Sequence, residues 1–150
     1  LVHRIREITA RVAPGRIGLE LTESGFMRDP DQAVQMTHAM KGAGFWLSID
    51  DFGTGYSSLS YLKRFAADTL KIDMSFVRDM LNNSHDRTIV DTIIAMARTL
   101  GMRTVAEGVE TADHANALMN MGCDQAQGYY YGRPVSAEEF AELWLKRGSG

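Results

Sequence analysis

The chain has 150 residues, 45% of them apolar and 23% charged, a composition typical of one globular domain with a buried core. A formal charge of -3 and a pI near 5.8 argue against a protein that binds nucleic acid, so we expect a small ligand. No run approaches the roughly twenty apolar residues that a membrane span needs, and the N-terminus does not resemble a signal peptide. Together with the lone cysteine, Cys123, these features favour the cytoplasm.

Hydrophobic periodicity predicts helices and strands in alternation. In chain order, the expected elements are a helix at 2–12, a strand at 17–21, a helix at 30–42, a strand at 46–50, a helix at 57–65, a strand at 69–72, a helix at 84–100, a strand at 103–106, a helix at 111–121, a strand at 123–127 and a helix at 136–144. Ser84, Thr111 and Ser136 are the expected N-caps of the last three helices, with Glu139 completing a capping box. This alternation predicts an α/β fold with a parallel sheet covered by helices.

Polar side chains recur where the expected strands end. They are Glu20, Asp50 with Asp51, Lys71, Glu107 and Gln127. Because the carboxyl ends of parallel strands meet at one face, these side chains should converge although they lie far apart in the sequence. Four carboxylates, one lysine and one amide on a single rim indicate oxygen-ligated metal chemistry.

The composition of this expected site also selects the metal. It contains no histidine or cysteine, so Mg²⁺ or Mn²⁺ is expected and zinc is not. We interpret the four histidines as surface or capping residues, since all fall in expected helices or near their starts: His3, His38, His85 and His114.

The acids near the first two strand ends need positive partners. Glu20 alternates with apolar neighbours, and burying it unpaired would be costly, so either a metal or a structural salt bridge should compensate it. Asp50 and Asp51 should repel each other unless a multivalent cation lies beside them; the alternative is a helix-cap acid beside a solvated acid. Lys71, flanked by apolar residues, should either pair with these acids or position phosphate and water.

Two further segments are candidates for function. Glu107 and Glu110 frame a turn: one is expected to be a base or a water-mediated metal ligand, and the other could equally be a charge at a helix N-terminus. Gln127 suits the orientation of water or of a base. The glycine-rich segment 52–59 permits close backbone approach to phosphate. It also resembles a dinucleotide fingerprint, but Ser58 replaces the third glycine.

Taken together, these motifs closely resemble the EAL-domain cyclic-di-GMP phosphodiesterases of bacteria. The matching segments are Leu19-Glu-Leu-Thr-Glu-Ser24, Ile49-Asp-Asp-Phe-Gly-Thr-Gly-Tyr-Ser-Ser-Leu59, Leu70-Lys-Ile-Asp73, Ala106-Glu-Gly-Val-Glu110 and Gln127-Gly-Tyr129 with Pro134. The resemblance implies a (β/α)₈ barrel that hydrolyses cyclic-di-GMP to linear pGpG with two Mg²⁺ or Mn²⁺ ions.

The resemblance also implies a role for each motif residue. Glu20, Asp50 and Asp51 would ligate metal, with Asp50 bridging both ions, and Glu107 would be the base or an outer metal ligand. Lys71 would hold the attacking water or the developing phosphorane charge, while Glu110 and Gln127 would orient water and substrate. Glu23 would anchor the loop that in this family links dimerisation to activity, formed by Phe52, Gly53, Thr54, Gly55, Tyr56, Ser57 and Ser58.

A complete (β/α)₈ barrel takes about 250 residues, so we expect residues 1–150 to be the C-terminal part of an EAL domain, an incomplete barrel of about five βα units. The Glu-Ala-Leu segment, its phosphate-binding Arg and an Asn ligand are missing, so we expect this chain alone to be inactive. Either the parent protein is a phosphodiesterase, or the chain is a half-barrel that binds or dimerises without turnover. Open sheet edges predict a homo-oligomer, and a parent protein could carry an upstream diguanylate-cyclase-like or sensor domain.

Overall fold

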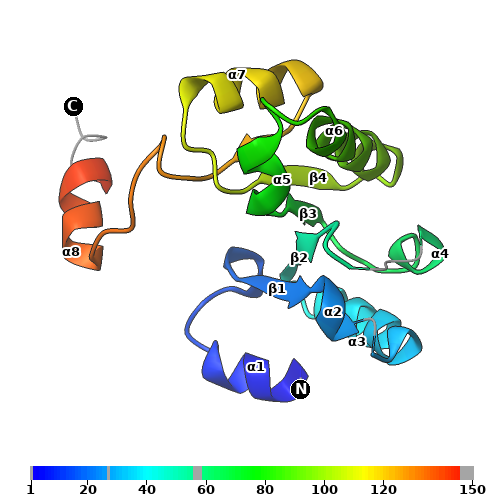
Figure 1. The fold of residues 1–150 in the computed structure, drawn as a ribbon. Coiled ribbons are helices and arrows are strands. Elements are labelled where there is room, and N and C mark those ends of the chain that lie inside the picture. Colours follow the sequence, from blue (N-terminus) through cyan, green and yellow to red (C-terminus); the bar gives the residue numbers. More distant parts are fainter. Residues whose placement is uncertain (1, 27, 56–58, 146–150) are drawn as a thin grey trace.

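The structure is a computed structural model and describes residues 2–26, 28–55 and 59–145. Five parallel strands form one sheet in the order β1-β2-β3-β4-β5, which confirms the expected α/β architecture (Figure 1). In chain order the elements are α1 (Val2–Ile8), η1 (Pro14–Arg16), β1 (Gly18–Thr22), α2 (Glu23–Phe26), α3 (Pro30–Gly42), β2 (Trp46–Phe52), α4 (Leu59–Leu62), β3 (Thr69–Ile72), α5 (Met74–Asp79), α6 (Ser84–Thr99), β4 (Arg103–Ala106), α7 (Ala112–Met121), β5 (Gln125–Ala126), α8 (Ala137–Phe140) and η2 (Ala141–Leu145).

The spatial order of the strands equals their order in the chain, as in a segment of a barrel. Each strand pairs in parallel with the next, and among the described residues β1 pairs only with β2 and β5 only with β4. The sheet is therefore open along both edges. Figure 1 shows α8 at the far end of an extended segment that leaves the β5 side of the sheet. No helix in the described ranges is long and apolar enough to cross a membrane.

Some expected boundaries are wrong. The first helix ends at Ile8, because the chain turns before Pro14 into a short 3₁₀ segment, and the last strand keeps only Gln125–Ala126. Asn83, not Ser84, is the N-cap of α6, and its side chain accepts the backbone N–H of His85. The expected helix at 57–65 begins partly outside the described residues, and α4 is its described part.

The core lies between the sheet and the helices. Its main cluster joins the helix-facing residues of β2 and β3 to α5 and α6, and includes Leu70, Ile72, Val77, Val90 and Ile94. A smaller cluster, formed by Met40, Ala43, Phe45 and Leu47, packs against residues of α1, α3 and β1. Since side chains alternate along a strand, burying Leu70 and Ile72 against the helices turns Lys71 to the opposite face of the sheet.

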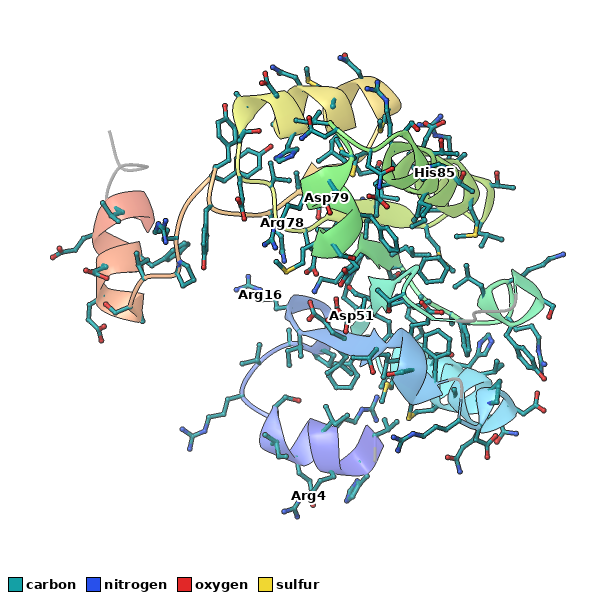
Figure 2. The ribbon with its side chains drawn as sticks, in the orientation of Figure 1. Arg4, Arg16, Asp51, Arg78, Asp79 and His85 are labelled. Carbon is teal, nitrogen blue, oxygen red and sulfur yellow. The ribbon has the colours of Figure 1, made fainter. Side chains whose placement is uncertain are left out.

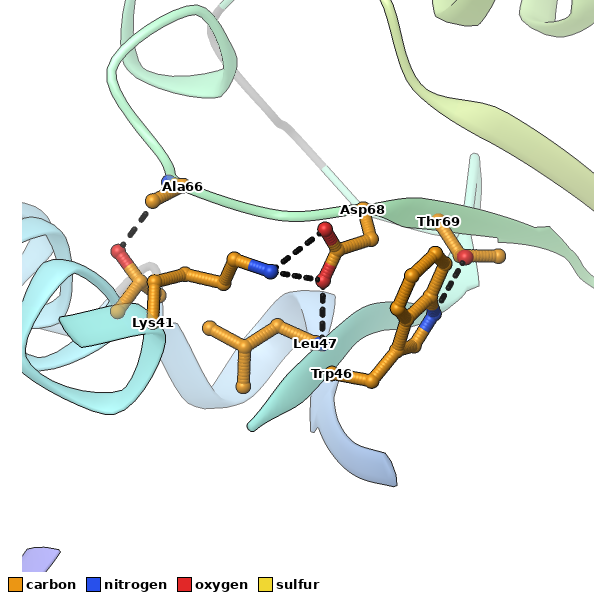
Figure 3. A network of polar contacts seen from close by, with 7 residues as sticks. Lys41, Trp46, Leu47, Ala66, Asp68 and Thr69 are labelled. Carbon is orange, nitrogen blue, oxygen red and sulfur yellow. Dashed lines mark hydrogen bonds and ion pairs between the residues drawn. The ribbon is translucent and has the colours of Figure 1, made fainter. Parts of the chain in front are cut away.

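The amino-terminal end of the sheet is held by carboxylates that lie just before alternate strands. Asp68, before β3, accepts two hydrogen bonds from Lys41 Nζ at 2.7 and 2.8 Å and one from the backbone N–H of Leu47 in β2 (Figure 3). Asp124, before β5, accepts the backbone N–H and the hydroxyl of Thr104 in β4. Each carboxylate thus ties its own strand to the preceding one.

We expect Asp68→Ala to lower the free energy of unfolding by about 2 kcal/mol, because the variant leaves both the Lys41 ammonium and the Leu47 N–H without their partner. Urea denaturation followed by circular dichroism measures the change. The matched control is Asp31→Ala, which removes an exposed ion pair with Arg64 and should cost less than about 1 kcal/mol. Equal losses in the two variants would contradict the role assigned to Asp68.

Candidate active site

Lys71 is the centre of a charge cluster at the carboxyl end of the sheet. Its side chain is 9% exposed, and its Nζ lies 3.1 Å from Glu20 Oε1, 2.9 Å from Asp50 Oδ1 and 2.8 Å from Glu107 Oε1. The three acids come from β1, from β2 and from the residue that follows β4. Side chains that are distant in sequence are thus brought together, as the strand-end pattern predicts.

The cluster carries more negative than positive charge. Burial alone would lower the pKa of Lys71, but its contacts with Glu107, Asp50 and Glu20 outweigh burial and hold the pKa above its ordinary value. Lys71 therefore stays charged and offsets one of the three carboxylates. Asp50 Oδ1 is buried and, apart from this ion pair, accepts no hydrogen bond from the described residues. The remaining negative charge favours an additional cation.

A β-bulge places the two adjacent aspartates. Between the pairs Ile49–Leu70 and Phe52–Ile72, β2 has two residues, Asp50 and Asp51, whereas β3 has only Lys71. The extra residue explains why the strand runs beyond its expected end and why Asp51 adopts a positive φ of 54°. Figure 2 labels Asp51 at this end of the sheet. The bulge turns both carboxylates toward the same site.

Asp50, Asp51 and Glu107 could hold a metal ion together. Each offers one carboxylate oxygen, and these oxygens lie within 4.8 Å of one another. The pKa of Asp51 is raised, first by its partial burial and then by the negative charges of Asp50 and Asp73. Hard oxygen donors with excess negative charge fit a divalent ion of the Mg²⁺ or Mn²⁺ type.

Gln127 positions Glu107 from the neighbouring strand end. Its Nε2 donates to Glu107 Oε1 at 2.7 Å, and its backbone carbonyl accepts the N–H of Val109 at 3.0 Å. Gly128 has a φ of 156°, and a Cβ there would lie 2.2 Å from the carbonyl oxygen of Val109. Residues 127–128 therefore pack closely on residues 107–109. This packing holds the Glu107 carboxylate in the position where it also contacts Lys71.

Glu23 anchors the segment that follows Asp51. It is buried and accepts the backbone N–H groups of Gly53 at 2.9 Å and Gly55 at 3.3 Å. A Cβ at Gly55 would lie 2.7 Å from Glu23 Oε1, so a larger residue here would displace the Glu23 carboxylate. Thr54 Oγ1 donates to the carbonyl of Asp51. Phe52 is buried in the core, and Tyr56, Ser57 and Ser58 of the expected loop lie outside the described residues.

Glu110 lies apart from the lysine cluster. Its Oε1 is 3.4 Å from Nη2 of Arg78, and both residues line a pocket of about 500 Å³ that also reaches Glu107 and Gln127. The other lining residues are Met74, Gly108, Gly128, Tyr129, Gly132, Arg133 and Pro134. The Arg133 guanidinium lies over the Tyr129 ring, 4.4 Å from its centroid.

The sequence-based prediction misplaced one residue near this pocket and missed two others. His114 was expected to be a surface or capping residue, but its side chain is buried, and its Nε2 lies 3.2 Å from the backbone carbonyl oxygen of Arg78. Arg78 and Arg133 were not predicted as site residues. Half-exposed arginines on a helix or loop resemble ordinary surface residues, and no pattern in the sequence distinguishes these two.

With this geometry established, comparisons with known proteins place the chain in a family. A family model described as the EAL domain matches residues 1–134. The bifunctional diguanylate cyclase/cyclic di-GMP phosphodiesterase MucR of Pseudomonas aeruginosa is 45% identical over 141 residues, which are 93% of this chain and 21% of that protein. The chain therefore spans about a fifth of the length of this curated relative.

Solved structures give the same result. The phosphodiesterase structure of PaMucR in complex with c-di-GMP has a TM-score of 0.90 at 44% identity, covering 93% of this chain and 57% of that chain. BlrP1 of Klebsiella pneumoniae, in a manganese and cy-diGMP complex, has a TM-score of 0.80 at 35% identity, covering 89% and 35%. These likenesses confirm the resemblance inferred from the motifs and the partial-barrel fold. The chain belongs to the EAL domain family.

Proposed function

We propose that these residues form the C-terminal part of the active site of a cyclic-di-GMP phosphodiesterase that uses two Mg²⁺ or Mn²⁺ ions. The observation that carries the proposal is the convergence of Asp50, Asp51 and Glu107 on one site beside Lys71. The relatives support the substrate, because MucR is named a cyclic di-GMP phosphodiesterase and its structure is a c-di-GMP complex. They also support the metal, because BlrP1 forms a manganese complex.

Within this proposal, each residue has a role that its geometry permits. Asp50, Asp51 and Glu107, whose carboxylate oxygens lie close together, would supply oxygen ligands to the metal, and so would Glu20, which contacts Lys71 beside Asp50. Two bound ions would lower the pKa of water and offset charge on the phosphoryl group. Lys71 holds its ammonium toward Glu107, where it can orient an attacking water or stabilise the phosphorane oxygen. Gln127 keeps the Glu107 carboxylate in place through the 2.7 Å hydrogen bond.

The activity is tested with two proteins: the 150-residue polypeptide, and a chimera in which the amino-terminal βα units of MucR precede it. We expect the polypeptide to give no detectable pGpG, because the family resemblance implies that a Glu-Ala-Leu segment and an Asn ligand from such units complete the metal site. The chimera should hydrolyse cyclic-di-GMP, and Glu20→Ala should reduce its rate about 100-fold. The matched control is Glu138→Ala, on the exposed surface of α8, which should leave the rate unchanged.

The outcomes separate the two functional hypotheses. A chimera that binds cyclic-di-GMP without hydrolysing it would favour the non-catalytic half-barrel over the phosphodiesterase. Robust hydrolysis by the polypeptide itself, abolished by Glu20→Ala, would show that the amino-terminal units are not needed.

We also propose that the polypeptide associates. The edges of β1 and β5 leave backbone groups unpaired within the described sheet, and such edges invite pairing with a second copy. The segment held by Glu23 offers a second contact surface. Light scattering of the hydrolysis samples over a dilution series checks this proposal, and a compact monomer at low micromolar concentration would contradict it.

A further inference from the structure

Arg78 lies at the boundary between α5 and the proposed ligand pocket. Figure 2 labels Arg78 on this helix. Its Nη2 is 3.4 Å from Glu110 Oε1, and both side chains line the pocket that also reaches Glu107 and Gln127. Its partner Glu110 is one of the motif residues expected to orient water and substrate.

The position of Arg78 is fixed by packing on both sides of its helix turn. The preceding residue, Val77, is fully buried in the core, and the backbone carbonyl of Arg78 contacts the Nε2 of buried His114 at 3.2 Å. One turn earlier, Met74 packs so closely on Gly108 that a Cβ there would lie 2.7 Å from the Met74 Cβ. Helix α5 therefore holds the 107–110 segment from one side, and the Arg78 side chain projects from a rigid base.

The Arg78–Glu110 pair has little effect on stability. The two side chains are 51% and 45% exposed, and ion pairs with this exposure are screened by water. Its effect is on orientation. Glu110 lines the same pocket as Glu107, and the hydrogen bond from Arg78 Nη2 is the contact that directs its half-exposed carboxylate along the pocket wall.

We propose that Arg78 is a positioning residue, which holds the Glu110 carboxylate on the pocket wall so that it can accept hydrogen bonds from a nucleotide base. This inference rests on the proposed function. A carboxylate accepts hydrogen bonds only, so it suits a base edge that presents two N–H donors, as guanine does and adenine does not. Tyr129 and Arg133 in the same pocket provide a stacked aromatic and cationic surface for the base.

NMR titration of the isotope-labelled 150-residue polypeptide with cyclic-di-GMP and Ca²⁺ tests the proposal, because the method detects even millimolar binding. We expect Arg78→Met to weaken binding about 10-fold and to shift the side-chain carboxyl resonance of Glu110 in the ligand-free protein. Arg78→Lys should restore part of the affinity. In a Glu110→Gln background, Arg78→Met should change affinity less than about 2-fold, since the two residues act as one unit. Cyclic-di-AMP should bind equally weakly to all variants.

The control variant is Arg87→Met, on the exposed face of α6, which should behave as the wild type. Equal weakening by Arg78→Met in both backgrounds would overturn the proposal, because Arg78 would then contact the ligand directly. An unchanged Glu110 carboxyl resonance in Arg78→Met would also overturn it, whatever the ligand does. If the wild type fails to bind cyclic-di-GMP, the proposed function is refuted, and so is the role of Arg78 in ligand binding. In that case the Glu110 carboxyl resonance still shows whether Arg78 and Glu110 interact.

Discussion

Replacing Lys71 by methionine should lower the free energy of unfolding by about 3–5 kcal/mol in metal-free buffer, the range for a buried ion pair that loses one partner. Lys71 is the only described cation within 4 Å of Glu20, Asp50 and Glu107, so the variant leaves these three carboxylates facing one another. Adding Mg²⁺ or Mn²⁺ should recover part of the loss, because a divalent ion can replace the missing ammonium. Urea denaturation with EDTA and with added metal measures both effects.

The control for Lys71 is Lys63→Met, at an exposed lysine, which should change stability by less than about 0.5 kcal/mol. The pH dependence follows from the pKa of Lys71, which is raised in the folded state. Because the pKa of Lys71 is higher in the folded state than in the unfolded state, its charged form stabilises the fold. This contribution to the free energy of unfolding is complete at any pH below the unfolded-state pKa of about 10.4, and it is lost only as the pH rises toward the folded-state pKa. The cost of Lys71→Met should therefore not fall between about pH 6 and 9. A variant as stable as the wild type would show that the carboxylates do not depend on Lys71.

The second large effect concerns metal affinity: Asp50→Ala should weaken Mn²⁺ binding about 100-fold or more. Asp50 belongs to the group with Asp51 and Glu107, and its Oδ1 is buried beside Lys71. Without its carboxylate, Asp51 and Glu107 cannot enclose an ion between them. Calorimetric titration of the 150-residue polypeptide, and of the chimera with MucR units, measures the loss.

Asp91→Ala provides the matched control for the metal experiment, since Asp91 is exposed on α6. This variant should give the wild-type isotherm. Identical isotherms for the wild type and Asp50→Ala would mean that any bound ion lies elsewhere, and the proposed metal site would then be wrong.

Features set by neighbouring residues could be predicted from the sequence. Thr111 caps α7, and Ser136 forms a capping box with Glu139, because each interaction spans three residues. Asn83 and Ser84 are both good N-caps in successive positions, so the sequence alone does not decide between them. The convergence of Glu20 and Lys71 was also predictable, since it follows from the parallel order of the strands.

Features set by distant contacts could not be predicted. The bulge that aligns Asp50 with Asp51 depends on how β2 pairs with β3, so periodicity within β2 gave a strand that ended too early. The burial of His114 depends on the carbonyl of a residue 36 positions away. Arg78 similarly gains its place near the pocket from the packing of α5 on the 107–110 segment, which no local pattern encodes.

The hydrogen bonds that Asp68 and Asp124 accept from the preceding strands have a consequence for how this molecule can evolve. They stabilise the end of the sheet opposite Lys71 and its acids. A cluster of mutually repelling carboxylates lowers the free energy of unfolding, and the hydrogen bonds at the opposite end of the sheet offset part of this loss. Substitutions that change the chemistry at one end should therefore leave the scaffold at the other end intact. Sequences can diverge in ligand and activity while they keep the same arrangement of strands.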